Sequence, residues 1–112
     1  MLKLPWKHIY FSGCGGVGMA ALAQIVLDCQ VKVSGSDLQD SELLQVLRER
    51  SCNIRLYQDS YLPDDIDLFV YSSAVPSDNP ERLSAEQRNV PSLNRGAFLA
   101  ELASFFPTVI AI

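Results

Sequence analysis

The sequence is poor in the side chains that most often carry catalysis or bind metals. Its 112 residues include a single histidine, His8, and three cysteines, Cys14, Cys29 and Cys52, whose spacing matches no metal-ligand pattern. A single histidine cannot form a His/Cys cluster. No Ser and Asp partners that would make His8 part of a catalytic triad are evident in the sequence. Because the chain is also shorter than most enzymes, we expect a binding module or one part of a larger protein.

Long apolar runs and an excess of positive charge are missing too. No run approaches the roughly 18 residues that a membrane-spanning helix needs, and residues 1–7 contain no secretory signal, which predicts a cytoplasmic location. Nine Lys and Arg against thirteen Asp and Glu give a net charge of -4. This balance favours neither nucleic acid nor an anionic membrane as a partner, although backbone amides can still build a local anion site.

Short apolar runs alternate with helical patterns, and turn residues separate them. We expect strands at 8–12, 31–34, 53–57, 68–71, 90–93 and 108–112, and helices at 17–29, 41–50, 80–88 and 96–106. Asp40 or Ser41 is the expected N-cap of the second helix, and Asn79 that of the third. This order predicts an α/β fold: a Rossmann-like, doubly wound, mainly parallel sheet with helices on both faces.

A glycine-rich segment joins the first strand to the first helix. It reads Gly13-Cys14-Gly15-Gly16-Val17-Gly18, which has the spacing G-x-G-x-x-G. Gly13 permits the tight turn, Gly15 lets the backbone approach a phosphate, and Gly18 lets the helix pack close to the strand. The helix N-terminus then offers unpaired N–H groups to a diphosphate. The alternative is a tight strand–helix turn without a ligand.

Two further segments follow predicted strands on the ligand side of such a sheet. Asp37 comes nineteen positions after Gly18, where a carboxylate usually accepts hydrogen bonds from ribose hydroxyls; a turn or capping role is the alternative. Ser72, Ser73 and Ala74 follow the strand at 68–71 and would flank the crevice at the switch point of the sheet, although a plain turn explains the serines as well.

For several other side chains, a structural role is an alternative to a functional one. The helix dipole would make Cys14 a reactive thiol, whereas a small side chain packed beside the sheet is the simpler expectation. His8 has no evident partner in the sequence and is expected to be structural or exposed. Asp64, Asp65 and Asp67 would suit a cation, but a solvated loop is favoured. The apolar stripe of the helix at 96–106 is expected to be core.

With these positions placed, the sequence resembles the N-terminal domain of the Mur ligases of peptidoglycan synthesis. The resemblance is carried in order by HIYFSGCGGVGM (8–19), VSGSDL (33–38), YSSAV (71–75), DNPE (78–81), and Arg95 followed by LAEL (99–102). It covers nearly the whole chain, and it implies that the domain binds the UDP part of UDP-N-acetylmuramate. The segment at 72–74 favours the family member that adds L-alanine over the one that recycles the muropeptide tripeptide.

The resemblance also implies roles for individual residues. The amides of Gly15, Gly16, Val17 and Gly18, after the turn at Gly13, would hold the diphosphate, and Asp37, flanked by Ser36 and Leu38, would hold the ribose. Ser72, Ser73 and Ala74 would line the nucleotide crevice, and Arg95 would assist the phosphates or form an ion pair at the helix start. Gln58 stands where the family often has a nucleotide-contacting histidine, so hydrogen bonding without charge is expected there.

The family further implies what this chain would not do alone. The complete ligase uses ATP and Mg²⁺ to form an acyl phosphate that L-alanine attacks, and residues 108–112 resemble the strand that leads into its ATP-binding domain. We therefore expect residues 1–107 to be a substrate-binding domain that holds no metal and is not catalytic without the central and C-terminal domains. Two alternatives stay open: an NAD-binding Rossmann domain of a dehydrogenase or regulatory module, and an interaction domain with an empty cleft.

Overall fold

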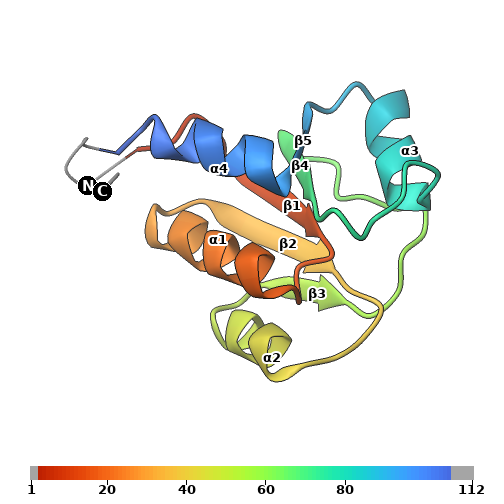
Figure 1. The fold of residues 1–112 in the computed structure, drawn as a ribbon, viewed down its shortest axis with the longest axis horizontal. Coiled ribbons are helices and arrows are strands. Elements are labelled where there is room, and N and C mark those ends of the chain that lie inside the picture. Colours follow the sequence, from red (N-terminus) through yellow and green to blue (C-terminus); the bar gives the residue numbers. More distant parts are fainter. Residues whose placement is uncertain (1–2, 107–112) are drawn as a thin grey trace.

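A five-stranded parallel sheet lies between helices in the computed structural model, which describes residues 3–106 (Figure 1). Its elements are β1 (His8–Ser12), α1 (Val17–Asp28), β2 (Lys32–Ser36), α2 (Glu42–Glu49), β3 (Asn53–Arg55), β4 (Leu68–Tyr71), α3 (Pro80–Gln87), β5 (Ser92–Asn94) and α4 (Arg95–Ala103). The strand order is β3-β2-β1-β4-β5, which confirms the predicted doubly wound fold. The strand predicted at 108–112 lies outside the described residues.

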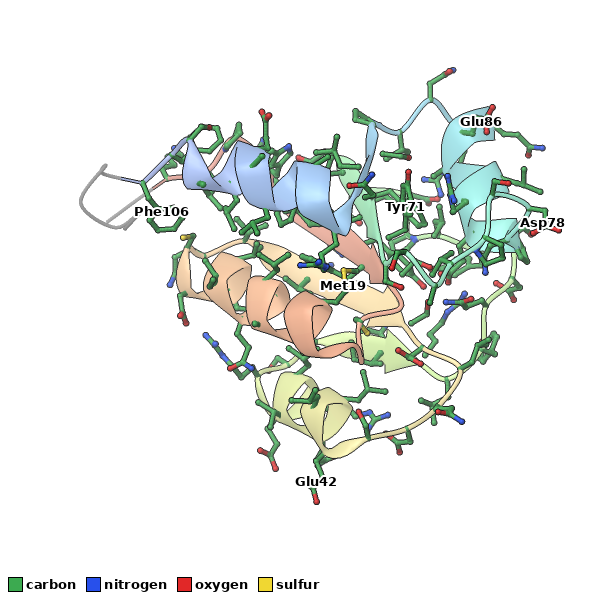
Figure 2. All side chains as sticks on the ribbon, in the orientation of Figure 1. Met19, Glu42, Tyr71, Asp78, Glu86 and Phe106 are labelled. Atoms are coloured by element: carbon green, nitrogen blue, oxygen red, sulfur yellow. The ribbon has the colours of Figure 1, made fainter. Side chains whose placement is uncertain are left out.

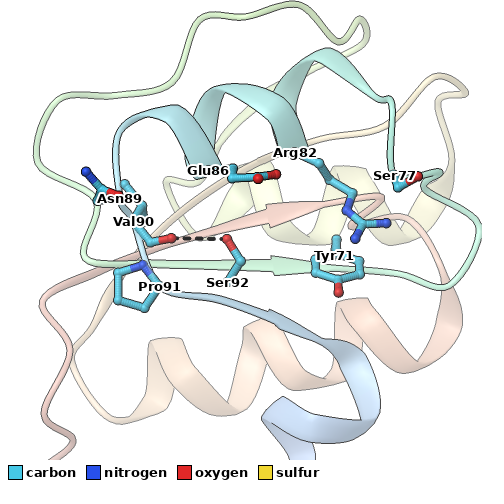
Figure 3. A pocket seen from close by; sticks show the side chains of 8 residues that line it. All are labelled: Tyr71, Ser77, Arg82, Glu86, Asn89, Val90, Pro91 and Ser92. Carbon is cyan, nitrogen blue, oxygen red and sulfur yellow. Dashed lines mark hydrogen bonds between the residues drawn. The ribbon is translucent and has the colours of Figure 1, made fainter.

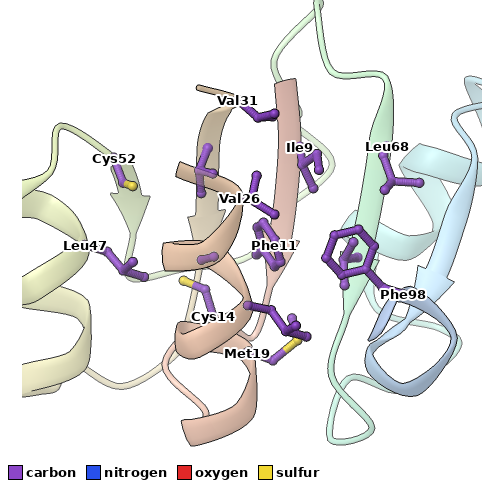
Figure 4. Packing of buried hydrophobic residues seen from close by; sticks show 14 of the residues in the cluster. Ile9, Phe11, Cys14, Met19, Val26, Val31, Leu47, Cys52, Leu68 and Phe98 are labelled. Carbon is purple, nitrogen blue, oxygen red and sulfur yellow. The ribbon is translucent and has the colours of Figure 1, made fainter. Parts of the chain in front are cut away.

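The two faces of the sheet bury separate apolar clusters because side chains alternate along each strand. Ile9 and Phe11 of β1 point into the larger cluster, which α1, α2 and α4 cover (Figure 4). Tyr10 points to the other face and stacks on Phe69, beneath α3 and the loop before β4. The continuous apolar sequence of β4 therefore reflects burial on both faces, as predicted.

The first three helices end one residue before their predicted ends, at positions where no glycine or proline marks the stop. α1, α2 and α3 are each followed closely by a residue with positive φ, at Gln30, Ser51 and Asn89. These residues take the left-handed position that glycine usually occupies after a helix, so the stop signal is weak in the sequence. The predicted caps are confirmed: Ser41 accepts a hydrogen bond from Leu44 N, and Asn79 caps α3.

Several strand and helix ends are corrected by one to three residues. The second strand runs to Ser36 instead of ending at 34, the third ends at Arg55 instead of 57, and the fifth covers 92–94 instead of 90–93. The last helix begins at Arg95, because Asn94 caps it by accepting from Ala97 N at 2.8 Å, and it ends at Ala103.

Most charged side chains of the described residues lie on the outside of the fold, Glu81 being an exception. Figure 2 shows Glu42, Asp78 and Glu86 projecting away from the sheet, whereas Met19 points between α1 and α4. Within residues 3–106, no helix has the length and apolar character needed to cross a membrane.

The strand order creates a crevice at one edge of the sheet. From β1 the chain passes through α1 to β2 on one side, whereas β4 pairs with β1 on the other side. The segments that leave the carboxyl ends of β1 and β4 therefore diverge in opposite directions, and ligands of open α/β sheets bind at such a switch point.

Candidate functional site

The glycine-rich loop after β1 is fastened to the ends of β2 and β4. Gly13 and Cys14 both donate their amides to the carbonyl oxygen of Ser36 at 2.9 Å. Gly13 has a φ of +81°, and a Cβ at this position would lie 2.7 Å from Ser72 Oγ. Only glycine therefore allows the loop to turn here against the end of β4.

Helix α1 presents an uncapped N-terminus to the crevice. Its N-cap residue, Gly16, has no side chain to accept a hydrogen bond, and the first turn carries no acidic residue. The first amides of a helix have no intrahelical partner, so those of Val17, Gly18 and Met19 are available at the positive end of the helix dipole. This arrangement suits an anion such as a phosphate.

Asp37 ties the same loop to the end of β2. Its Oδ2 accepts a hydrogen bond from Gly15 N at 2.9 Å, and its Oδ1 accepts one from Gln39 N at 3.1 Å. A Cβ on Gly15 would lie 2.8 Å from Asp37 Oδ2, so the approach of the carboxylate requires glycine at position 15. Asp37 is half-buried and lines the crevice.

A hollow of about 340 Å³ lies between these groups. Its lining consists of Gly13, Gly16, Asp37, Leu38, Gln58, Ser72, Ala74, Val75, Pro76 and Asn79. We call it the glycine-loop hollow. It brings together seven of the thirteen residues predicted for the site. Of the others, Ser73 and Arg95 line a neighbouring hollow, and Ser36 is buried beneath the loop.

A buried carboxylate under the glycine-loop hollow was missed by sequence reasoning. Glu81 in the first turn of α3 is fully buried. Its Oε1 accepts hydrogen bonds from Ser12 Oγ and Ser36 Oγ, both at 2.7 Å. Its Oε2 accepts from Tyr10 Oη at 2.5 Å and from Arg55 Nη2 at 3.3 Å. Burial, reinforced by this negative charge, raises the pKa of Tyr10 well above its ordinary value.

Gln58 connects this buried carboxylate to the hollow. Its Nε2 donates to Ser12 Oγ at 3.3 Å and to Ser36 Oγ at 3.1 Å, and its Oε1 accepts from Asn79 Nδ2 at 2.6 Å. Asn79 in turn accepts from the amide of Glu81 at 2.8 Å. The side-chain amide of Gln58 is thus held at both ends, with its polar atoms beside the glycine loop.

The sequence held one weak signal for this network. Tyr10 and Ser12 alternate with apolar residues in β1, and Ser34 and Ser36 do the same in β2, so four polar side chains share one face of two neighbouring buried strands. Buried polar groups need partners, and a charged residue on the covering element is one way to supply them.

Both His8 and Cys14 are buried in the structure. His8 is buried and does have partners: Nδ1 lies 2.7 Å from Asp65 Oδ1 and Nε2 lies 2.7 Å from Ser34 Oγ. Cys14 is fully buried, and burial raises the pKa of its thiol to about 12, so the dipole-activated alternative is wrong. The carboxylate of Asp67 accepts hydrogen bonds from the backbone amides of Lys7 and His8 and so stabilises the start of β1.

The described residues offer no metal centre. Within 3–106, no group of three or more His, Cys, Asp or Glu residues is placed to hold a metal ion.

Comparisons with known proteins agree over nearly the whole chain. A family model described as "Mur ligase family, catalytic domain" matches residues 8–107. UDP-N-acetylmuramate–L-alanine ligases from Persephonella marina and Aquifex aeolicus are 43% and 41% identical over 94% and 91% of this chain. Those alignments cover 23% and 22% of the relatives, so the chain spans less than a quarter of their length.

Solved structures give the same result for the fold. The crystal structure of UDP-N-acetylmuramate-alanine ligase from Thermotoga maritima matches with a TM-score of 0.83 and 31% identity, over 88% of this chain and 23% of that one. UDP-N-acetylmuramate:L-alanyl-gamma-D-glutamyl-meso-diaminopimelate ligase from Neisseria meningitides matches with a TM-score of 0.76 and 22% identity, over 85% of this chain and 30% of that one. The second likeness bears on the fold alone.

Proposed function

Because this chain belongs to the Mur ligase family, we propose that it binds the UDP part of UDP-N-acetylmuramate for a ligase that adds L-alanine. The observation that carries the proposal is the glycine-loop hollow, where the free amides of α1 and the carboxylate of Asp37 meet. The complete ligase would act in the cytoplasm with ATP and Mg²⁺, and the domains that bind them would be its partners. The chain alone forms no product.

The two halves of the nucleotide call for different chemistry in the hollow. In this proposal the free amides of Val17 and Gly18 hold the diphosphate, since neutral donors at a helix end stabilise negative charge without adding net charge. Asp37 takes the ribose hydroxyls. Leu38 is 67% exposed at the rim and offers an apolar surface to the uracil ring.

The remaining predicted residues support these contacts. Ser72, Ser73 and Ala74 are small enough to leave the crevice open, and the serines can donate to the ligand. Gln58 lines the hollow as an uncharged hydrogen-bonding group, and Ser36 fixes the loop beneath it through its carbonyl oxygen.

The relatives favour this reading over the dinucleotide alternative. Only the glycine loop and Asp37 support the interpretation as an NAD-binding domain, whereas the sequences of L-alanine ligases match more than nine-tenths of the chain. Calorimetry with UDP-N-acetylmuramate, UDP and NAD tests the choice directly. We expect binding of the two uridine nucleotides; a preference for NAD would refute the proposal.

A substitution at Asp37 tests the ribose contact. Asp37→Ala should weaken UDP binding by about 1–3 kcal/mol, the usual cost of losing hydrogen bonds to a charged group. The matched control is Asp40→Ala, because Asp40 is an exposed carboxylate that pairs with Arg48 and does not line the hollow.

A second ligand separates the ribose contact from the bond between Asp37 and Gly15. UDP and 2′,3′-dideoxy-UDP are titrated into the wild type and the Asp37→Ala variant, which makes a double-mutant cycle between protein and ligand. We expect the variant to lose affinity for UDP and to lose much less for the dideoxy nucleotide. Equal losses of affinity for the two nucleotides would mean that Asp37 acts only by holding the glycine loop and does not contact the ribose.

A further inference from the structure

Helices α1 and α4 lie side by side on one face of the sheet (Figure 1). Each follows a strand of the parallel sheet, β1 or β5, so both helices start at the edge where the glycine-loop hollow opens and run in the same direction. At that edge they are in contact, because a Cβ on Gly18 would lie 3.1 Å from Arg95 Cδ. The two helices therefore present one joint outer surface.

The side of α4 that points away from the sheet is uncharged. Phe98 and Leu102 are the buried residues of this helix. Successive residues of a helix are rotated by about 100°, so the exposed positions opposite those two are Gly96, Ala97, Ala100 and Ala103. The charged residues Arg95 and Glu101 lie on the flanks. Neither has an ion pair among residues 3–106, so the ion pair predicted for Arg95 is not formed there.

Two larger apolar side chains extend this uncharged side toward α1. Leu99 comes one turn after Arg95, on the flank of α4 that meets α1, and is 47% exposed. Ile25 comes two turns after Gly18, on the flank of α1 that meets α4, and is 38% exposed. Asp28 is the single charged residue in the twelve of α1. We call the α1–α4 face the surface formed by Ala21, Ile25, Gly96, Leu99, Ala100 and Ala103.

The other two helices have a different outer side. α2 and α3 each carry three charged residues among eight, whereas α4 carries two among nine. Figure 3 shows Arg82 and Glu86 of α3 at a hollow of about 410 Å³. A helix that is apolar on all sides is normally buried, and contiguous apolar patches mark interaction sites. The α1–α4 face therefore has the composition of a covered surface.

The length of the relatives indicates what covers this face. The chain spans less than a quarter of the L-alanine ligases that it matches. The family model matches to residue 107, just after α4 ends at Ala103, and residues 108–112 resemble the strand that leads into the ATP-binding domain. In the complete ligase that domain would thus be joined to the end of α4. Seated on the α1–α4 face, it would lie along the nine residues of α4, about 14 Å, toward the glycine-loop hollow.

We propose that the α1–α4 face packs against the ATP-binding domain of the complete ligase. This proposal rests on the proposed function, because it takes the chain to be one domain of that ligase. The contact is apolar at its centre: the small side chains of α4 let another backbone approach closely, and Leu99 and Ile25 provide the larger apolar area. Arg95 and Glu101 border it as a charged rim, which is the usual arrangement of a protein interface.

Amide hydrogen exchange tests the proposal by comparing the 112-residue chain with the complete ligase. We expect the amides of α4 to exchange about tenfold slower or more in the complete ligase, because packing suppresses local opening of the helix. The amides of α2 and α3 should exchange at similar rates in both proteins. Leu99→Gln in the complete ligase should remove most of the slowing of α4, since the lost apolar contact lies in the interface.

Leu83→Gln is the matched control. Leu83 is 43% exposed on α3, so the same substitution there changes a similar side chain away from the α1–α4 face, and α4 should stay slow. Leucine and glutamine have similar helix propensities. Both variants should therefore leave the urea midpoint of the 112-residue chain nearly unchanged, which shows that the loss in the complete ligase is not a folding defect.

Four results would overturn the proposal. They are equal exchange of α4 in the chain and the ligase, equal slowing of all four helices, slow exchange of α4 that survives Leu99→Gln, and light scattering that shows a dimer of the ligase dissociated by Leu99→Gln but not by Leu83→Gln. The last result would assign the face to a second copy.

The calorimetric titration with UDP separates this proposal from the proposed function. Protection of α4 in a ligase that binds no uridine nucleotide rejects the proposed function only. Binding of UDP without protection of α4 rejects the docking of the ATP-binding domain only, and the absence of both rejects both.

Discussion

Replacing the buried Glu81 by glutamine should remove a large share of the stability of the domain. The change keeps the shape of the side chain but turns one of two oxygens into an amide that donates. On the Oε2 side the amide would face the donors of Tyr10 and Arg55, and on the Oε1 side it would face the hydroxyls of Ser12 and Ser36. In either orientation two hydrogen bonds to a charged acceptor are lost or inverted.

The size of the effect follows from those bonds. A hydrogen bond to a charged group contributes about 1.5–3 kcal/mol, and breaking a buried charge pair costs about 3–5 kcal/mol. We expect Glu81→Gln to lower the free energy of unfolding by about 3–5 kcal/mol, which is a fifth or more of the roughly 5–15 kcal/mol typical of native proteins.

Urea unfolding followed by the fluorescence of Trp6 measures this loss. Trp6 is the single tryptophan, and its ring centre lies 5.6 Å from that of Phe98 and 5.7 Å from that of Phe105, so its emission reports on the core. With a slope of about 1–3 kcal/mol per molar urea, the midpoint should fall by about 2 M.

Tyr10→Phe is the matched comparison. It removes one donor to Glu81 and keeps the ring that stacks on Phe69 at 5.9 Å, so it should cost about 1.5–3 kcal/mol, the contribution of a single hydrogen bond to a charged group. If Glu81→Gln costs no more than Tyr10→Phe, the carboxylate does not organise the four donors, and the account of the buried network is wrong.

Two other predictions concern the backbone of β2 and the response to acid. Gly35→Ala should lower the urea midpoint by an amount comparable to a core defect, because its Cβ would lie 2.5 Å from the carbonyl oxygen of Phe11; an unchanged midpoint would contradict this contact. Hydrogen bonds from neighbouring donors hold the pKa values of Asp40, Asp59 and Asp65 below 3.8. The stability that these carboxylates contribute is therefore complete above about pH 4, and it is lost as the pH falls through their lowered pKa values. At pH values below about 4, the urea midpoint of unfolding should decrease. A midpoint that stays constant between pH 5 and 3 would exclude this linkage.

The order of elements and the glycine loop were predictable because their signals are local. Apolar runs, capping residues and the G-x-G-x-x-G spacing are each contained in a few neighbouring positions. The predicted second strand ends at 34, directly before Gly35, and a glycine inside a strand usually weakens it. Gly35 is instead required inside β2, where Phe11 and Cys14 approach too closely for any side chain.

The buried network was not predictable in the same way. Glu81 takes its partners from β1, β2 and β3, between 26 and 71 positions away along the chain. An acidic residue in the first turn of a helix usually faces solvent and favours the dipole, so Asn79-Pro80-Glu81 indicated only a helix start. The same holds for His8, whose partner Asp65 is 57 positions away.

The direction of the hydrogen bonds around Gln58 limits which side chains can replace it. Ser12 and Ser36 each have one hydroxyl proton, and both protons point to Glu81, so their oxygens can only accept from position 58. Glutamine meets this condition, and so does a histidine whose ring nitrogen donates. Glutamate has the same length but no proton to give at neutral pH. Variation at this position should therefore follow the ability to donate, rather than charge or size.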